Sequence, residues 1–187
     1  MCYFASNQGN LSDADNYSAT AISNSISKLL EACILDNIKS FADVDKYQFG
    51  FKPKHSTTLC TSILKRTINY YTSTGSHVFT CFVDLSKAFD KENYWKLFDK
   101  LFDDNIAASL ISFLVFWYTN QTTFVRWHDN SSASFSVGSG TRQGSILSPC
   151  LFTRYLRELI ASTVQCAIGC NVGGTYVNIL VYADDMS

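Results

Sequence analysis

The sequence is poor in charged residues and has almost no net charge. Charged residues make up 17% of its 187 residues, which is below the roughly 25% that is usual in soluble proteins. Fifteen basic and sixteen acidic side chains give a net charge of −1 at pH 7. This balance excludes a polycation that holds nucleic acid by bulk charge. Hydrophobic residues make up 47%, so the chain can bury a core and is not disordered as a whole.

The sequence also lacks a hydrophobic leader and an apolar run of membrane length. Residues 1–16 are polar and acidic, so we expect no signal peptide. The longest charge-free apolar run of interest, Ile106 to Tyr118, has thirteen residues, whereas a membrane-spanning helix needs roughly 20. We therefore expect no transmembrane segment and no membrane partner, and this run is typical of a buried helix.

Paired cysteines and clusters of zinc ligands are missing as well. The seven cysteines are odd in number and irregular in spacing, and only Cys166 and Cys170 lie close together, without a nearby histidine. The pattern therefore indicates neither a zinc site nor a disulfide framework. Reduced cysteines that pack as small apolar residues are typical of an intracellular protein, either cytoplasmic or nuclear.

Hydrophobic periodicity predicts a mixture of helices and strands, in the α/β or α+β class. The predicted helices cover residues 21–41, 56–71 with Ser56 as the N-cap, 91–102, 106–120 and 146–161, and the predicted strands cover residues 78–83, 122–128, 134–137 and 175–181. Residues 138–144 form a glycine-rich loop, and residues 1–15 are expected to be a disordered or extended lead-in. Because residues 78–83 are apolar on both faces, we predict a central, buried strand there.

Two of the predicted strands end in carboxylates. Asp84 follows the strand over residues 78–83, and Asp184 and Asp185 follow the last strand. If the two strands are neighbours in one sheet, three carboxylates converge at one end. Carboxylate oxygens suit Mg²⁺, and two such ions can clamp both oxygens of an in-line phosphoryl displacement. The spacing alone also fits a structural interpretation, in which the Asp pair forms a turn and Asp84 caps a helix.

Three segments in a defined order carry a resemblance to a known family. They are Phe82-Val83-Asp84-Leu85-Ser86-Lys87-Ala88-Phe89-Asp90, then Gly140-Thr141-Arg142-Gln143-Gly144-Ser145-Ile146-Leu147-Ser148-Pro149, then Tyr182-Ala183-Asp184-Asp185. They resemble motifs A, B and C of a reverse transcriptase, most closely those of non-LTR (LINE-type) retrotransposon polymerases. Upstream, Gln48-Phe49-Gly50-Phe51 with His55-Ser56-Thr57-Thr58 resembles a fingers motif of that family, and residues 16–17 with 27–31 resemble its first fingers segment. The resemblance covers residues 16–187.

The resemblance implies a right-hand polymerase fold with an antiparallel palm sheet. Residues 16–77 would be fingers-like and residues 78–187 would be an incomplete palm, with the thumb absent. Only Met186 and Ser187 follow the motif C turn, so we expect a frayed turn that nothing pairs across to hold. We also expect the isolated chain to be weakly active or inactive.

The resemblance further implies an RNA-directed DNA polymerase that transfers dNTPs onto a primer 3′-end. RNA template, DNA primer and dNTPs would be its partners; the sequence indicates no oligomeric state. Asp84 and Asp184 would bind two Mg²⁺ ions, for which Mn²⁺ could substitute, and Asp185 would be the third acidic group of the catalytic site.

Five further residues are implied to bind nucleotide. Phe89 falls where the family places an aromatic ring beneath the deoxyribose, which excludes a 2′-hydroxyl. Gln143 and Gly144 match the loop that lies against the nascent base pair. For Arg142, contact with template or nucleotide and a plain solvated charge are both open. The same choice is open for Lys52, which would face the triphosphate.

Departures from the family pattern keep two other functions open. Asn16-Tyr17-Ser18 lacks the arginine that usually follows Asn-Tyr in the first fingers segment, and Lys52 stands where arginine is frequent. A catalytically silent retroelement relic that binds nucleic acid or a protein partner is one alternative. The other is an RNA-dependent RNA polymerase-like palm, against which Phe89 argues.

Overall fold

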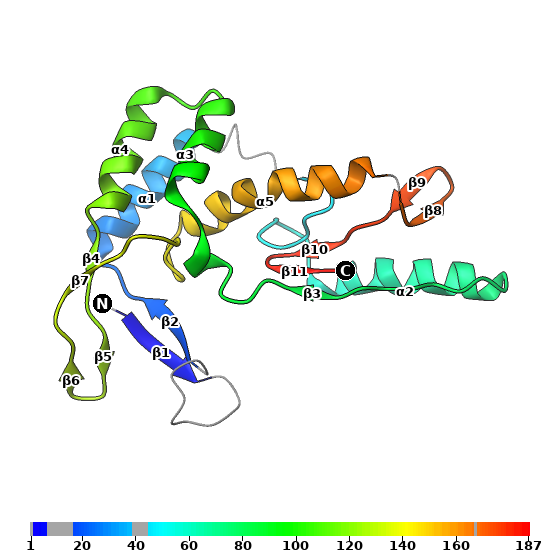
Figure 1. Cartoon of the computed structure of the whole chain (residues 1–187), viewed down its shortest axis with the longest axis horizontal. Helices are drawn as coiled ribbons and strands as arrows, with labels where there is room; N and C mark the ends of the chain where they lie inside the picture. The colour runs from blue at the N-terminus through cyan, green and yellow to red at the C-terminus, as the bar shows by residue number, and fades with distance from the viewer. Residues whose placement is uncertain (1, 7–16, 39–44, 167) are drawn as a thin grey trace. The chain divides into compact units, whose positions relative to one another are not determined.

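The computed structural model describes residues 2–6, 17–38, 45–166 and 168–187. Contacts divide the chain into two compact units. Unit 1 comprises residues 1–43 and 87–155, and unit 2 comprises residues 44–86 and 156–187. Both units combine helices with small antiparallel sheets (Figure 1).

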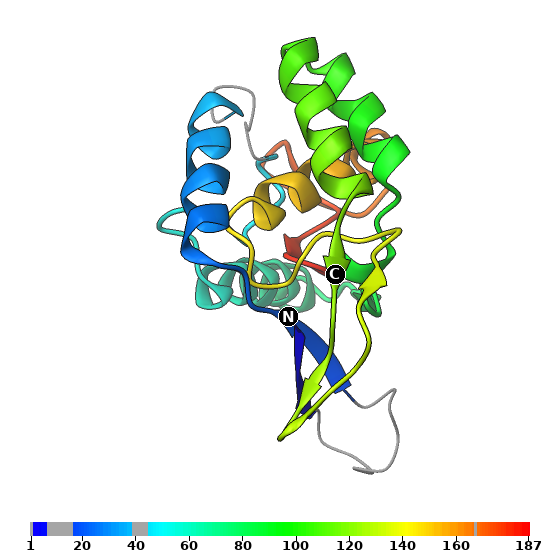
Figure 2. The same ribbon diagram turned by 90° about the vertical axis from the view of Figure 1, so that its left-hand side faces the viewer.

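Unit 1 is built around helices that bury one continuous core. They are α1 (Ser25–Ile38), α3 (Tyr94–Asp103), α4 (Ala108–Thr119) and the first part of α5 (Ser148–Gln165). Helices α3 and α4 contact each other and stand side by side in Figure 2. The core residues of these helices and their connections are Ile34, Ile38, Tyr94, Leu97, Phe98, Leu101, Ile106, Leu114, Tyr118, Leu147 and Leu151.

Two hairpins complete unit 1. Strand β1 (Cys2–Ser6) pairs with β2 (Tyr17–Ala21), so residues 2–6 of the expected lead-in are extended. The second hairpin has an outer pair, β4 (Thr122–Thr123) with β7 (Phe135–Ser136), and an inner pair, β5 (Arg126–Trp127) with β6 (Asn130–Ser131). The predicted strands over residues 122–128 and 134–137 are therefore present only in part, and the hairpin turn lies at His128 and Asp129. Strand β1 also contacts β5.

Unit 2 holds α2 (Thr57–Ser73) and two small sheets. Ser56 caps α2, and its side chain accepts a hydrogen bond from the Leu59 N–H, as predicted. One sheet has the order β10-β11-β3, formed by Val181–Tyr182, Asp185–Met186 and Val83–Asp84. The other pairs β8 (Cys170–Val172) with β9 (Thr175–Val177). Phe49, Cys60 and Leu180 form the core under the first sheet.

The predicted helices are confirmed within the described residues. Helix α1 covers the centre of the prediction over 21–41, whose residues 39–41 lie outside the described residues. Helices α2, α3 and α4 fall within about three residues of their predicted bounds. Helix α5 begins at Ser148 with Pro149 in its first turn, where the missing proline N–H costs no helical hydrogen bond.

The predicted central strand over residues 78–83 is wrong. Only Val83–Asp84 are in a strand, and the sheet order makes β3 an edge strand with β11 as its neighbour. Phe79 is 96% exposed and Phe82 is 72% exposed. A fully buried strand needs a neighbour on each side and a layer on each face. The described residues of unit 2 supply β11 alone as a strand neighbour here, so an apolar run did not become a central strand.

The predicted strand over residues 175–181 is interrupted. Its two ends become β9 and β10, and residues 178–180 between them are not in a strand. Next to the break, the side-chain amide of Asn178 donates to the carbonyls of Thr163 and Val164 at 3.2 and 3.4 Å. These bonds attach residue 178 to the end of α5.

Among the described residues, no helix combines the length and the apolar character needed to cross a membrane.

Leu97 provides a test of the unit 1 core. Its side chain is 0% exposed on α3, so Leu97→Ala leaves a cavity and should lower the free energy of unfolding by about 2–5 kcal/mol. Chemical denaturation followed by circular dichroism measures this. Lys96→Ala, at the neighbouring exposed position, is the matched control and should change it by less than about 0.5 kcal/mol. A loss of that small size for Leu97→Ala would contradict the assigned core.

Candidate active site

A tight turn between β10 and β11 carries two of the three predicted catalytic carboxylates. Val181 pairs with Met186 and Tyr182 pairs with Asp185, so Ala183 and Asp184 form a two-residue turn. Ala183 has φ of +58°. A positive φ at the first turn position usually falls to glycine, and a residue with a Cβ adopts it at a cost of roughly 1–2 kcal/mol.

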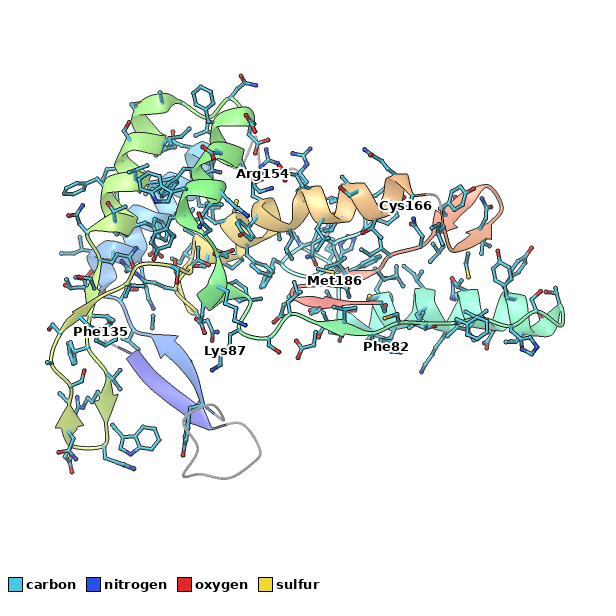
Figure 3. The ribbon with its side chains drawn as sticks, in the orientation of Figure 1. Phe82, Lys87, Phe135, Arg154, Cys166 and Met186 are labelled. Carbon is cyan, nitrogen blue, oxygen red and sulfur yellow. The ribbon has the colours of Figure 1, made fainter. Side chains whose placement is uncertain are left out.

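The third carboxylate lies directly across the sheet from this turn. Strand β11 pairs with β3 so that Asp185 faces Asp84 and Met186 faces Val83. Residues paired in this way point to the same face, with Cβ atoms about 4.5–5.5 Å apart. Two like charges this close repel, so the pair is a natural place for a cation. Figure 3 shows Met186 on β11 and Phe82 next to β3.

The turn is held on both sides, which overturns the expectation of a frayed turn. Strand β11 pairs with β10 and with β3. Beyond it, the Ser187 N–H donates to the Leu180 carbonyl at 2.9 Å, and the Leu180 N–H donates to the Ser187 carbonyl at 2.8 Å. The expectation was wrong because two or three residues suffice for the returning strand when a second strand covers its other edge.

Two of the three carboxylates, those of Asp84 and Asp185, border an open hollow of unit 2. Its volume is about 410 Å³, and Asp84, Asp185, Tyr182 and Thr61 are among its lining residues. Lys52 belongs to the same unit and lies half-buried in the loop before α2, where its carbonyl accepts a hydrogen bond from the His55 N–H at 3.2 Å.

The paired carboxylates fit a divalent cation by the chemistry of their donors. Mg²⁺ is commonly bound through one or two carboxylates, with substrate phosphates and water filling its other positions. Asp84 and Asp185 meet that requirement by their register. Across the described residues, no three acidic, histidine or cysteine side chains converge closely enough to form a metal cage by themselves.

Four of the five predicted nucleotide-binding residues, Phe89, Arg142, Gln143 and Gly144, lie in unit 1, and hydrogen bonds connect the two segments that carry them. The ring of Phe89 stacks on Phe152, with centroids 4.3 Å apart and planes inclined by 26°. The Phe89 carbonyl accepts a hydrogen bond from the Thr141 N–H at 2.8 Å, and the Gly140 N–H donates to the Glu92 carbonyl at 2.9 Å. The glycine-rich loop is thereby attached to the segment that follows Asp84 in the chain.

The rest of this loop contacts Gln121 and Ala21. Arg142 Nε donates to Gln121 Oε1 at 2.9 Å, so its guanidinium is anchored and half-buried. The Gln143 carbonyl accepts from the Ala21 N–H at 2.9 Å. Gly144 has φ of +96°, and a Cβ there would lie 3.1 Å from the Ala21 carbonyl oxygen. Arg142 and Gln143 line an open hollow of about 470 Å³.

The structure therefore assembles the predicted residues in two groups. Asp84, Asp184, Asp185 and Lys52 belong to unit 2, and Phe89, Arg142, Gln143 and Gly144 belong to unit 1. In the first group the strand register brings Asp84 and Asp185 together. In the second, hydrogen bonds connect Phe89 to the loop that carries the other three residues.

Comparison with known proteins identifies the family. The sequence profile of the reverse transcriptase (RNA-dependent DNA polymerase) family matches residues 11–187. The chain belongs to the reverse transcriptase family. The RNA-directed DNA polymerase from mobile element jockey is similar over 94% of the chain at 29% identity in Drosophila funebris, and over 92% at 28% identity in Drosophila melanogaster. The match covers 19% of the length of either relative.

A third relative lies in another element. The retrovirus-related Pol polyprotein from type-1 retrotransposable element R2 of Popillia japonica is 23% identical over 95% of this chain and 25% of its own length. These relatives agree with the predicted resemblance to non-LTR reverse transcriptases.

Sequence reasoning assigned no role to two buried polar residues of this reverse transcriptase chain. Gln48 and Glu92 are each 1% exposed. Gln48 lies within the fingers motif that carried part of the resemblance, and its side chain contacts the turn at Ala183. The polar Gln48 inside a motif could have indicated a structural role. Its partner could not be found from the sequence, because Ala183 lies 135 positions away.

Glu92 is buried beneath the glycine-rich loop without full hydrogen bonding. Within the described residues, its two carboxylate oxygens, the Thr141 Oγ1 and the Tyr94 hydroxyl are buried and form no hydrogen bond. Burial raises the pKa of Glu92 from 4.5 to about 7, and the nearby polar groups of Thr141 partly oppose this rise. A neutral Glu92 therefore suits the fold better than an ionised one.

Glu92 should make stability depend on pH. In the unfolded chain the carboxyl ionises near 4.5, whereas the folded chain keeps the proton until about pH 7. The unfolding free energy should therefore be highest below pH 4.5 and fall as pH rises to about 7. The pKa difference corresponds to roughly 3 kcal/mol.

Denaturation between pH 4 and 8 tests this dependence. Glu92→Gln is neutral at every pH and should remove most of the fall. Asp99→Asn, which changes an exposed carboxylate of the same helix region, is the matched control and should retain it. A wild-type slope that survives in Glu92→Gln would show that other groups cause it.

Proposed function

We propose that this chain carries the catalytic carboxylates of an RNA-directed DNA polymerase of the non-LTR retrotransposon type. The reaction is the transfer of a dNTP onto a primer 3′-end, directed by an RNA template. The observation that supports the proposal most is the register of β11 with β3, which faces Asp185 toward Asp84. Family membership supports the same reaction class.

By the family resemblance, Asp84 and Asp184 would hold two Mg²⁺ or Mn²⁺ ions, and Asp185, which pairs with Asp84 across the sheet, would be the third acidic group. Bound there, the ions would supply the Lewis acidity that activates the primer 3′-hydroxyl and the charge that holds the triphosphate. The chain's own contribution is positional: β3 presents Asp84, and the β10–β11 turn presents the other two carboxylates. Lys52 would add a point charge for the triphosphate.

Phe89 would select deoxyribonucleotides. Its ring is supported by the stack on Phe152, and Phe152 is 1% exposed, so the ring has little freedom to move aside for a 2′-hydroxyl. Arg142 would contact template or nucleotide from its anchor on Gln121, and Gln143 and Gly144 would lie against the nascent base pair. We propose the fingers-like range 16–77 and the palm-like range 78–187 on the same basis, within a right-hand polymerase fold.

Metal binding tests the proposed catalytic carboxylates. Mn²⁺ binding to the purified chain, followed by electron paramagnetic resonance at pH 7, should weaken by about tenfold or more in Asp84→Asn, because one ligand is lost. Asp129→Asn, in the exposed turn of the unit 1 hairpin, is the control and should bind like the wild type. Equal Mn²⁺ affinity of Asp84→Asn and the wild type would contradict the proposed site.

Primer extension on an RNA template tests the reaction and its nucleotide preference. Any extension should require Asp84 and prefer dNTPs, and Phe89→Val should raise ribonucleotide use relative to dNTP use by about tenfold, equivalent to ~1.4 kcal/mol. Extension that prefers NTPs in the wild type would favour an RNA-dependent RNA polymerase. Salt-dependent binding of primer–template without extension would favour a catalytically silent nucleic-acid binder.

A further inference from the structure

The side-chain amide of Gln48 binds both backbone groups of Ala183. Its Nε2 donates to the Ala183 carbonyl at 3.1 Å, and its Oε1 accepts from the Ala183 N–H at 2.9 Å. Oε1 also accepts from the Gly50 N–H at 2.8 Å. Two N–H donors on one oxygen settle the orientation of the amide, because the flipped form would set its NH₂ group against both of them.

The backbone beside Gln48 extends the sheet that carries the turn. Gln48 forms a parallel bridge with Val181. The Phe49 N–H donates to the Val181 carbonyl at 2.7 Å, and the Val181 N–H donates to the Tyr47 carbonyl at 2.9 Å. Residues 47–49 therefore lie along the edge of β10 that β11 leaves free, and the amide of Gln48 is brought to the turn by main-chain pairing.

The backbone of Gly50 lies too close to Ala183 for any side chain at position 50. A Cβ on Gly50 would lie 2.3 Å from the Ala183 nitrogen and 3.0 Å from Gln48 Oε1. Glycine is required here by this approach. The same residue, Ala183, holds the left-handed conformation with φ of +58°, which a residue with a Cβ keeps only when its surroundings determine it.

We propose that Gln48 is a positioning residue of the polymerase site, whose amide clamps the Ala183 backbone and thereby holds Asp184 in the turn and Asp185 in register with Asp84. The positioning role of Gln48 rests on the proposed function. The hydrogen bonds between Gln48 and Ala183 are a property of the fold and do not depend on it. Asp184 follows Ala183 directly, so a change in the Ala183 conformation rotates the peptide that carries Asp184. A buried amide that merely satisfied its own polar atoms would have no such effect on metal binding.

Amide hydrogen exchange of the full chain measures the clamp without reference to activity. In the wild type the Ala183 N–H should exchange slowly, because Gln48 Oε1 accepts it. Gln48→Met keeps the volume and removes both polar atoms, so exchange at Ala183 should accelerate by about tenfold or more. Ser187, whose N–H donates to Leu180, reports whether the sheet itself remains paired.

Two further variants protect the test against simple unfolding. Gln48→Glu keeps an acceptor for the Ala183 N–H but loses the donor to its carbonyl, so the turn should loosen less than in Gln48→Met. Cys60→Ala removes part of the same unit's core, where Cys60 packs with Phe49 and Leu180, and leaves every bond of the amide in place. It should lower thermal stability without selectively accelerating Ala183 exchange.

Mn²⁺ affinity then distinguishes positioning from general stabilisation. Gln48→Met should weaken Mn²⁺ binding by about tenfold, which corresponds to ~1.4 kcal/mol. In an Ala183→Gly background the left-handed conformation carries no Cβ penalty, so the same substitution should weaken binding by a smaller factor. That non-additivity is a readout that a merely structural role of Gln48 would not produce.

The outcomes separate this proposal from the proposed function. Wild-type Ala183 exchange as fast as in Gln48→Met would overturn the clamp, whatever the metal does. Slow exchange that Gln48→Met accelerates, together with unchanged Mn²⁺ affinity, would overturn the positioning role. If Asp84→Asn leaves Mn²⁺ binding unaltered, the proposed function fails, and the exchange result still decides whether the clamp exists.

Discussion

The candidate site depends on the antiparallel register between β11 and β3. That register places Asp185 opposite Asp84, although the two residues stand about a hundred positions apart in the chain. It also sets like charges against each other, which costs stability unless a cation or solvent screens them. A slip by one residue would turn Asp185 to the opposite face of the sheet. The candidate site therefore requires a fixed register from short strands, and pairing on both sides of β11 compensates for their length.

Gln48 and Glu92 are both buried, and they offset the free-energy cost of removing a polar group from water in different ways. Gln48 uses both ends of its amide, and its bonds reach the backbone of Ala183 in the β10–β11 turn and of Gly50 beside it. The carboxylate of Glu92 forms no hydrogen bond among the described residues, and its burial raises its pKa and favours the neutral form. We expect the first arrangement to restrict the motion of the turn. We expect the second to make the stability of the region around Glu92 depend on pH near neutrality.

Local patterns predicted the local structure well and the pairing of strands poorly. The positions of α2, α3 and α4 could be predicted because their apolar residues lie in uninterrupted helical segments, and Ser56 was recognisable as a cap. Residues 78–83 were read as a central strand because they are apolar, yet Phe79 and Phe82 are exposed. Apolar composition indicates that a segment favours burial. Strand formation additionally needs a neighbouring segment with free N–H and C=O groups.

The sequence by itself determined the order and chemistry of the motifs, and with them the family. Asp84, Asp184 and Asp185 could be chosen as catalytic candidates, and Phe89 and Gln143 as nucleotide contacts, because residue type and local spacing carry that information. Only the tertiary structure decided that Asp185 faces Asp84, that Gln48 forms hydrogen bonds with Ala183 and that Glu92 is buried. The physical reason is that register, hydrogen-bond partners and desolvation depend on segments far apart in the chain, whose meeting no local pattern records.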